Sequence, residues 1–254
     1  MKIALFADYN GGERIWPALE EALEEQRLDL IAFVGDIIDT PARAEEWKYL
    51  LETGKPSSKK RPELEQDAVV EELAYREFFI NLTGFGVPVV FVPGHQDAPV
   101  SRLLEMAEGF SNVYNVHGKP FKYSGYTFAG LGGGIGPVDC DEVVYCSSEK
   151  KASKILPADW CSDPEHSILL AHTPPQSRMT LDAGKNTHSG SRVINELIET
   201  CKPAFCLAGD VTGSPGQDML GSTLVVNPGS MFKGRYALVD LEQHRVLFPT
   251  QLKM

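Results

Sequence analysis

Short apolar runs alternate with amphipathic stretches along most of the chain. The first unit predicts a strand, an acidic helix and a strand at residues 2–7, about 13–26 and 30–35. The C-terminal third repeats this order at 167–171, 190–201 and 204–208. Apolar runs of strand length separated by helices are typical of parallel βαβ units. The pattern therefore predicts an α/β fold.

Two segments depart from this pattern. Residues 119–131 alternate apolar and polar positions around Ser124-Gly125, which predicts a β-hairpin. Residues at about 41–83 form a helical excursion instead, with a charged helix, an exposed polar loop over 54–62 and a second helix. In that second helix we expect three apolar side chains to share one side: Leu73, Phe78 and Phe79.

The chain then closes with short strands near 223–226, 235–241 and 244–249. It shows neither an internal repeat nor a linker of domain length. We therefore expect a single domain over residues 1–254, which is ample length for a sizeable core.

Charge and cysteine usage narrow the classes of function. The chain has 24 basic and 35 acidic residues, a net charge of −11, which argues against binding a nucleic-acid backbone or an anionic membrane. With no charged leader and no long apolar stretch, we expect a cytoplasmic protein. The five cysteines form no C-x-x-C pair, so we expect reduced structural thiols.

Five metal-ligand residues each follow a predicted strand: Asp8, Asp36, His95, His172 and Asp210. Loops that leave the carboxyl ends of parallel strands meet at one edge of the sheet, which is where α/β folds bind ligands. Taken singly, Asp8 and Asp36 could equally be helix caps, and Asp210 a turn residue. Taken together, the five predict a metal site.

The order of these residues resembles that of the calcineurin-like metallophosphoesterases. Those proteins carry D-x-H, G-D, G-N-H-[DE], a lone His and G-H-x-H after successive strands. The corresponding segments here are Asp8-Tyr9-Asn10, Gly35-Asp36, Gly94-His95-Gln96-Asp97, His172 and Gly209-Asp210-Val211-Thr212. The chain is similar to the small prokaryotic branch over essentially its whole length. This resemblance implies a two-sheet β-sandwich flanked by helices, a four-layer αββα architecture like that of metallo-dependent phosphatases.

The resemblance also implies two metal sites that share Asp36. One would consist of Asp8, Asn10, Asp36 and Thr212, and the other of Asp36, His95, His172 and Asp210. The first set offers only oxygen, which suits Mg²⁺, Mn²⁺ or Ca²⁺. The second keeps two imidazoles and two carboxylates, which suits Mn²⁺, Fe²⁺ or Zn²⁺. We therefore expect a divalent metal (Mn, Fe, Zn or Mg), and one ion rather than two.

The third motif supplies the catalytic candidates His95, Gln96 and Asp97. Many family members have a histidine at the position of Gln96, and an amide cannot protonate a leaving group. The resemblance implies a metal-dependent phosphoesterase acting on a small phosphodiester, phosphomonoester or nucleotide, with a remodelled site. The alternative is a catalytically impaired member that binds a phosphorylated ligand or a protein. Oligomeric state is not predicted.

Three further segments leave alternatives open. The glycine-rich segment 130–136 fails the spacing of a nucleotide-binding loop, so we expect a flexible loop beside the site. His188 could contact the site or begin a helix. The 41–83 excursion, which carries Trp47 and Tyr49, could cover the cleft or form an interface.

Overall fold

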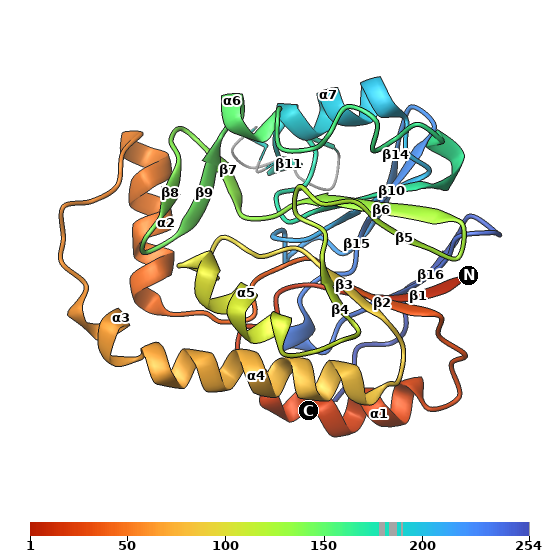
Figure 1. The fold of residues 1–254 in the computed structure, drawn as a ribbon, viewed down its shortest axis with the longest axis horizontal. Coiled ribbons are helices and arrows are strands. Elements are labelled where there is room, and N and C mark those ends of the chain that lie inside the picture. The colour runs from red at the N-terminus through yellow and green to blue at the C-terminus, as the bar shows by residue number, and fades with distance from the viewer. Residues whose placement is uncertain (178–180, 183–186, 189, 254) are drawn as a thin grey trace.

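Two six-stranded mixed sheets pack face to face, with helices on their outer sides (Figure 1). The computed structural model describes residues 1–177, 181–182, 187–188 and 190–253. This arrangement confirms the predicted two-sheet sandwich flanked by helices. No helix in the described part of the chain is both long and apolar enough to cross a membrane.

The first sheet has the strand order β17-β16-β1-β2-β3-β4. Its strands are β1 (Lys2–Phe6), β2 (Leu30–Phe33), β3 (Val89–Phe91), β4 (Val113–Asn115), β16 (Ala237–Asp240) and β17 (Arg245–Leu247). Strands β1 to β4 are parallel, and the last residues of β1, β2 and β3, which are Phe6, Phe33 and Phe91, lie in register. The loops after β1, β2 and β3 therefore leave from the same edge.

The second sheet has the order β14-β15-β13-β10-β6-β5. Its strands are β5 (Phe121–Tyr123), β6 (Tyr126–Leu131), β10 (Ser167–Ala171), β13 (Phe205–Ala208), β14 (Gly216–Leu220) and β15 (Thr223–Asn227). Ala171 at the end of β10 pairs with Ala208 of the parallel β13, so the loops after these strands also share an edge. The predicted hairpin is confirmed, since Ser124 (φ 48°) and Gly125 (φ 85°) join β5 to β6 in the left-handed conformations that such a turn needs.

Helices cover the outer face of each sheet. They are α1 (Trp16–Leu23), α4 (Ala68–Gly84) and α5 (Val100–Glu108) on the first sheet, and α7 (Arg192–Cys201) on the second. Strand β1 shows why, because its side chains alternate between two cores. Ala4 and Phe6 pack under the helices, whereas Ile3 and Leu5 pack between the two sheets.

One expectation for the second helix of the excursion is wrong. Phe78 and Phe79 of α4 are fully buried, but Leu73 is 59% exposed. At 3.6 residues per turn, Leu73 points to the opposite side of α4 from the two phenylalanines. Apolar character alone therefore did not identify the buried face of this helix.

The excursion packs against a small third sheet. Its other helices are α2 (Pro41–Thr53) and α3 (Pro62–Gln66), and the small sheet consists of β7 (Gly134–Gly136), β8 (Cys140–Asp141) and β9 (Tyr145–Ser148). The structure also describes α6 (Glu149–Ala152), β11 (Leu181–Asp182), β12 (Thr187–His188) and three short 3-10 helices. Leu50 of α2 is buried against Val144, which precedes β9, and Cys146 of β9. Helix α2 therefore packs against the small three-stranded sheet.

The glycine-rich segment is not the flexible loop that its sequence predicts. Its residues belong to the end of β6, a tight connection and β7. A Cβ on Gly132 would lie 2.6 Å from Cδ of Pro93, and one on Gly134 would lie 2.3 Å from the Trp47 ring. The glycines are needed because neighbouring groups approach the backbone closely.

The expectation of reduced cysteines is wrong for one pair. Cys161 and Cys201 form a disulfide bond, which ties the segment before β10 to the end of α7. Cys140, Cys146 and Cys206 are free. The two bonded cysteines are 40 residues apart in sequence, so only the fold brings them together.

A buried ion pair joins three of the helices. Arg43 of α2 is fully buried and donates hydrogen bonds to Glu71 of α4 over 2.7 and 3.2 Å. Arg102 of α5 also donates to Glu71, and Arg43 donates to the carbonyl oxygen of Ala98. This network therefore connects the excursion to the loop after β3, which carries His95.

We expect Arg43→Ala to lower the free energy of unfolding by about 3–5 kcal/mol, because it leaves the Glu71 carboxylate buried with one partner fewer. Urea denaturation measures this change. Lys48→Ala on the same helix is the matched control, since the Lys48–Glu52 pair is 4.0 Å long and exposed and its loss should cost at most about 0.5 kcal/mol. Equal effects of the two substitutions would contradict the assigned role of Arg43.

Candidate metal centre

All five predicted strand-end residues lie at the edge where the parallel strands of both sheets end. Asp8 follows β1, Asp36 follows β2 and His95 follows β3 in the first sheet, while His172 follows β10 and Asp210 follows β13 in the second. Four of the five are buried, and the side chain of Asp210 is 21% exposed. Two different sheets therefore contribute to one site.

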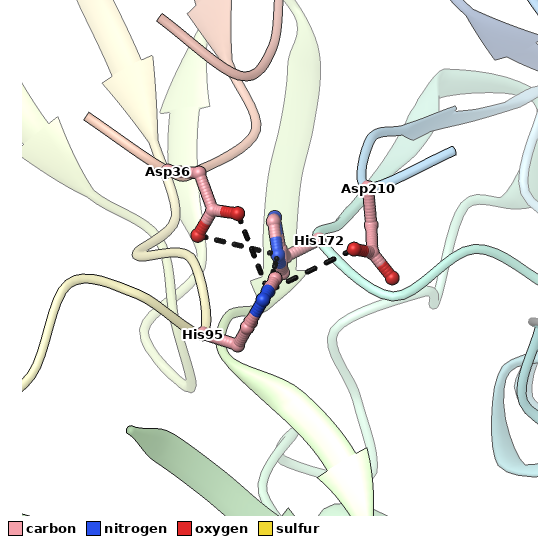
Figure 2. Close-up of side chains that lie close together, drawn as sticks. All are labelled: Asp36, His95, His172 and Asp210. Atoms are coloured by element: carbon pink, nitrogen blue, oxygen red, sulfur yellow. Dashed lines mark hydrogen bonds and ion pairs between the residues drawn. The ribbon is translucent and has the colours of Figure 1, made fainter. Parts of the chain in front are cut away.

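Four of these side chains point toward one another (Figure 2), and we refer to them as the ligand cluster: Asp36, His95, His172 and Asp210. One ligand atom from each lies within 4.8 Å of the others. Nδ1 of His95 is 2.8 Å from Nε2 of His172, 3.3 Å from Oδ2 of Asp36 and 3.7 Å from Oδ1 of Asp210. Nε2 of His172 is 3.5 Å from Oδ1 of Asp36.

The backbone at the strand ends is strained. Asp8, Asp36 and Asp210 have φ values of 54°, 63° and 64°, and the left-handed conformation costs a non-glycine residue on the order of 1–3 kcal/mol. Hydrogen bonds from the amides of Asp8 and Asn10 to the carbonyls of Gly35 and Asp36 hold the first two loops side by side. The strain turns the carboxyl groups toward the shared edge.

Asp97 fixes the second and third loops to each other. Its fully buried carboxylate accepts hydrogen bonds from the amides of Asp36 (3.0 Å), Ile37 (2.9 Å) and Gly94 (2.7 Å). Its described contacts thus position the loops that carry Asp36 and His95. A direct part of Asp97 in catalysis remains a prediction.

The orientation of the His172 ring follows from its second nitrogen. Nδ1 lies 2.8 Å from the carbonyl oxygen of Val34, which can only accept, so Nδ1 carries a hydrogen and donates it. In the neutral ring, Nε2 then has a free lone pair directed into the ligand cluster. This is the arrangement that metal-binding histidines usually adopt.

His95 is held by a residue that sequence reasoning did not place in the site. The Trp47 ring of α2 lies 4.9 Å from the His95 ring at an interplanar angle of 33°, and the amide of Tyr145 donates to the His95 carbonyl over 2.8 Å. Helix α2 therefore covers part of the site, which was one of the two roles left open for the excursion. The sequence carries no motif that marks Trp47.

Two glycines allow the loops to approach this closely. A Cβ on Gly94 would lie 1.9 Å from Oδ1 of Asp36, and one on Gly35 would lie 2.5 Å from Nδ1 of His172. Real Cβ atoms do not approach other atoms this closely. The glycines that precede His95 and Asp36 are thus part of the construction of the site.

The ligand cluster favours a positive charge at its centre. Burial first, and then the nearby carboxylates Asp36 and Asp210, raise the pKa of Asp8 well above its usual range. Burial likewise raises the pKa of Asp36. Although burial opposes it, the three carboxylates raise the pKa of His172 to about 9, whereas burial lowers the pKa of His95 to about 4. A cation bound between these groups would relieve the repulsion among the carboxylates.

Oxygen atoms beside the ligand cluster also remain available for a ligand. Among the described residues, Oδ2 of Asp8, Oδ1 of Asn10 and Oε1 of Gln96 are buried without a hydrogen-bond partner. The backbone of Thr212 follows Asp210, but no described contact joins its hydroxyl to the ligand cluster; its carbonyl accepts from Arg235 over 3.5 Å. The side chain of His188 lies outside the described residues.

Comparisons with known proteins agree with this architecture. The family "Metallophosphoesterase, calcineurin superfamily" matches residues 1–250. Over 183 residues the chain is 27% identical to "Uncharacterized protein MJ1162" of Methanocaldococcus jannaschii, covering 70% of this chain and 76% of that protein.

Solved structures share the fold. The protein TT1561 of Thermus thermophilus has a TM-score of 0.75 at 24% identity, with 98% of each chain covered. A dimetal phosphatase from Danio rerio has a TM-score of 0.59 at 12% identity, covering 99% of this chain and 96% of that one. Because the family match extends over nearly the whole sequence and the strand ends carry a buried Asp/His cluster, this chain belongs to the calcineurin superfamily of metallophosphoesterases.

Proposed function

We propose that the protein hydrolyses phosphate esters with one divalent metal ion held by the ligand cluster. The observation that carries this proposal is the convergence of two imidazole nitrogens and two carboxylates within 4.8 Å, in a family of phosphoesterases. The donor set fits Mn²⁺, Fe²⁺ or Zn²⁺ better than Mg²⁺, which prefers oxygen. Such an ion would supply Lewis acidity and offset the charge of a phosphoryl group.

We favour one ion over two because the second position has weaker ligands. It would depend on Asp8, Asn10 and the shared Asp36, and the hydroxyl of Thr212 has no described contact with them. The unpartnered oxygens of Asp8 and Asn10 fit a hard cation or a water molecule. This position therefore adds less affinity than the two imidazoles of the ligand cluster.

Gln96 stands where many family members have a histidine that can protonate the leaving group. Its backbone amide donates to Oδ1 of Asp36 over 2.9 Å, and its side-chain oxygen is buried beside the site. A side-chain amide can orient a phosphoryl group or a leaving group, but it cannot donate a proton to it as an acid. We therefore propose small phosphodiesters, phosphomonoesters or nucleotides with stable leaving groups as substrates.

The alternative is a member of the family that binds a phosphorylated ligand or a protein partner without turnover. The departures from the family's motifs at Asn10, Gln96, Asp210 and Thr212 favour it. Protein loaded with Mn²⁺ and assayed on a p-nitrophenyl phosphodiester separates the two proposals. Saturable turnover supports the enzyme, whereas stoichiometric metal without turnover supports the binding protein.

We expect His172→Ala to lower metal affinity by at least about tenfold, because it removes a nitrogen whose orientation is fixed by Val34. Competition with a chelating dye measures the affinity. His166→Ala is the matched control, since the side chain of His166 is 49% exposed and pairs with Asp163, away from the ligand cluster. Equal metal affinity in both variants would remove His172 from the ligands.

Gly94→Ala should abolish metal binding, although Gly94 has no ligand atom. Its new methyl group would force Asp36 and the loop before His95 apart. Metal content after dialysis is the readout. Gly84→Ala at the end of α4 is the control, because a Cβ there meets nothing within 4 Å. Full metal content in Gly94→Ala would show that the ligand cluster tolerates a different loop geometry.

The role of Gln96 predicts a specific gain of function. Gln96→His should raise kcat by about a hundredfold for diesters with poor leaving groups, the lower range for general acid catalysis. Diesters with good leaving groups such as p-nitrophenol should respond much less. A plot of log kcat against leaving-group pKa should become flatter in the variant. The same slope in both proteins would rule out missing acid catalysis as the limit on turnover.

A further inference from the structure

Helix α4 is apolar on both of its sides. Its inner side buries Tyr75, Phe78, Phe79 and Leu82 under the first sheet. Its opposite side, which we name the outer face of α4, exposes four large aliphatic side chains: Val69 (65%), Val70 (64%), Leu73 (59%) and Ile80 (53%). Surface helices normally carry charged or polar residues on the side that faces away from the core.

The aliphatic residues of the outer face form an ordered row. Leu73 follows Val69 by four residues and Ile80 follows Leu73 by seven, spacings that repeat on one side of a helix. At about 100° per residue, these three side chains fall within about 40° of one another. The row spans residues 69 to 80, about three turns of the helix, with a gap of about two turns between Leu73 and Ile80.

Two opposite charges flank the middle of this row. Arg76 and Glu77 are both exposed, and neither forms an ion pair within the described part of the chain. They are neighbours in sequence, so they lie on opposite flanks of the row. Such an arrangement is complementary to itself when a second helix of the same sequence is laid across it in the antiparallel direction.

We propose that the outer face of α4 binds the same face of a second copy of this chain, with a two-fold axis between residues 76 and 77. In this register Arg76 faces Glu77 of the partner subunit, and Leu73 faces Ile80 of the partner subunit. The two-fold axis produces each contact twice, as in other isologous interfaces. This inference is independent of the proposed function.

The interface would be small. One pair of 17-residue helices covers less than the roughly 1,200–2,000 Å² of stable complexes. The net charge of −11 on each copy also opposes association. We therefore expect a reversible dimer whose fraction rises with protein concentration.

Sedimentation velocity of the full chain across a wide range of concentrations tests the proposal. The parent protein should shift from monomer to dimer, and Leu73→Lys should weaken dimerisation by at least about tenfold, because it places a charge in the apolar row. Leu247→Lys on β17 is the matched control, since Leu247 is 50% exposed and lies on a different element. A parent that stays monomeric, or equal weakening by both substitutions, would overturn the proposal.

A charge exchange tests the register. Arg76→Glu and Glu77→Arg should each weaken the dimer, because each places like charges opposite one another. The double variant should restore the parent affinity, since it exchanges the two partners of the same pair. Circular dichroism should remain that of the parent in every variant. A double variant as weak as the single ones would refute the antiparallel pairing.

Discussion

The hydrogen bonds that the Asp97 carboxylate accepts are the interactions on which the site depends most. This carboxylate accepts hydrogen bonds from the backbone amides of Asp36, Ile37 and Gly94. These amides follow β2 and β3, where the backbone no longer pairs with a neighbouring strand. One buried side chain therefore supplies the hydrogen-bond acceptors for two loops. Burial first, and then the charge of Asp36, raise the pKa of Asp97 to about 6. The loops tolerate an acidic group in the interior because it satisfies several buried amides at once.

The sheets supply the rigidity that such a site needs. Parallel strands in register deliver Asp36 and His95 from one sheet and His172 from the other, and the strained backbone turns the carboxyl groups inward. A site built in this way brings together features that each raise the free energy of the folded state: a strained backbone, like charges and buried polar atoms. The hydrophobic layers elsewhere provide the stability that offsets them.

The sequence predicted those features of the fold that neighbouring residues in the chain determine. Strand β10 has the predicted bounds, and Ser124-Gly125 form the predicted turn. The failures concern contacts between segments distant in sequence. Leu73 is an exception, because at 3.6 residues per turn it lies on the other side of α4 from Phe78 and Phe79, and its apolar character alone did not mark the buried side. The close approach of Trp47 to His95 is a property of the assembled fold, because α2 and the loop after β3 meet only there.

The disulfide has a consequence for one member of the ligand cluster, His172. It closes a loop that begins at Cys161, contains β10 with His172, and ends on α7 at Cys201. In the chain-entropy description, closing a loop of this length disfavours the unfolded chain by about 4 kcal/mol. Asp36, His95 and Asp210 lie outside the loop. A thiol reductant therefore acts on the covalent framework around His172 alone, and the redox potential of the surroundings becomes a determinant of how firmly β10 holds His172.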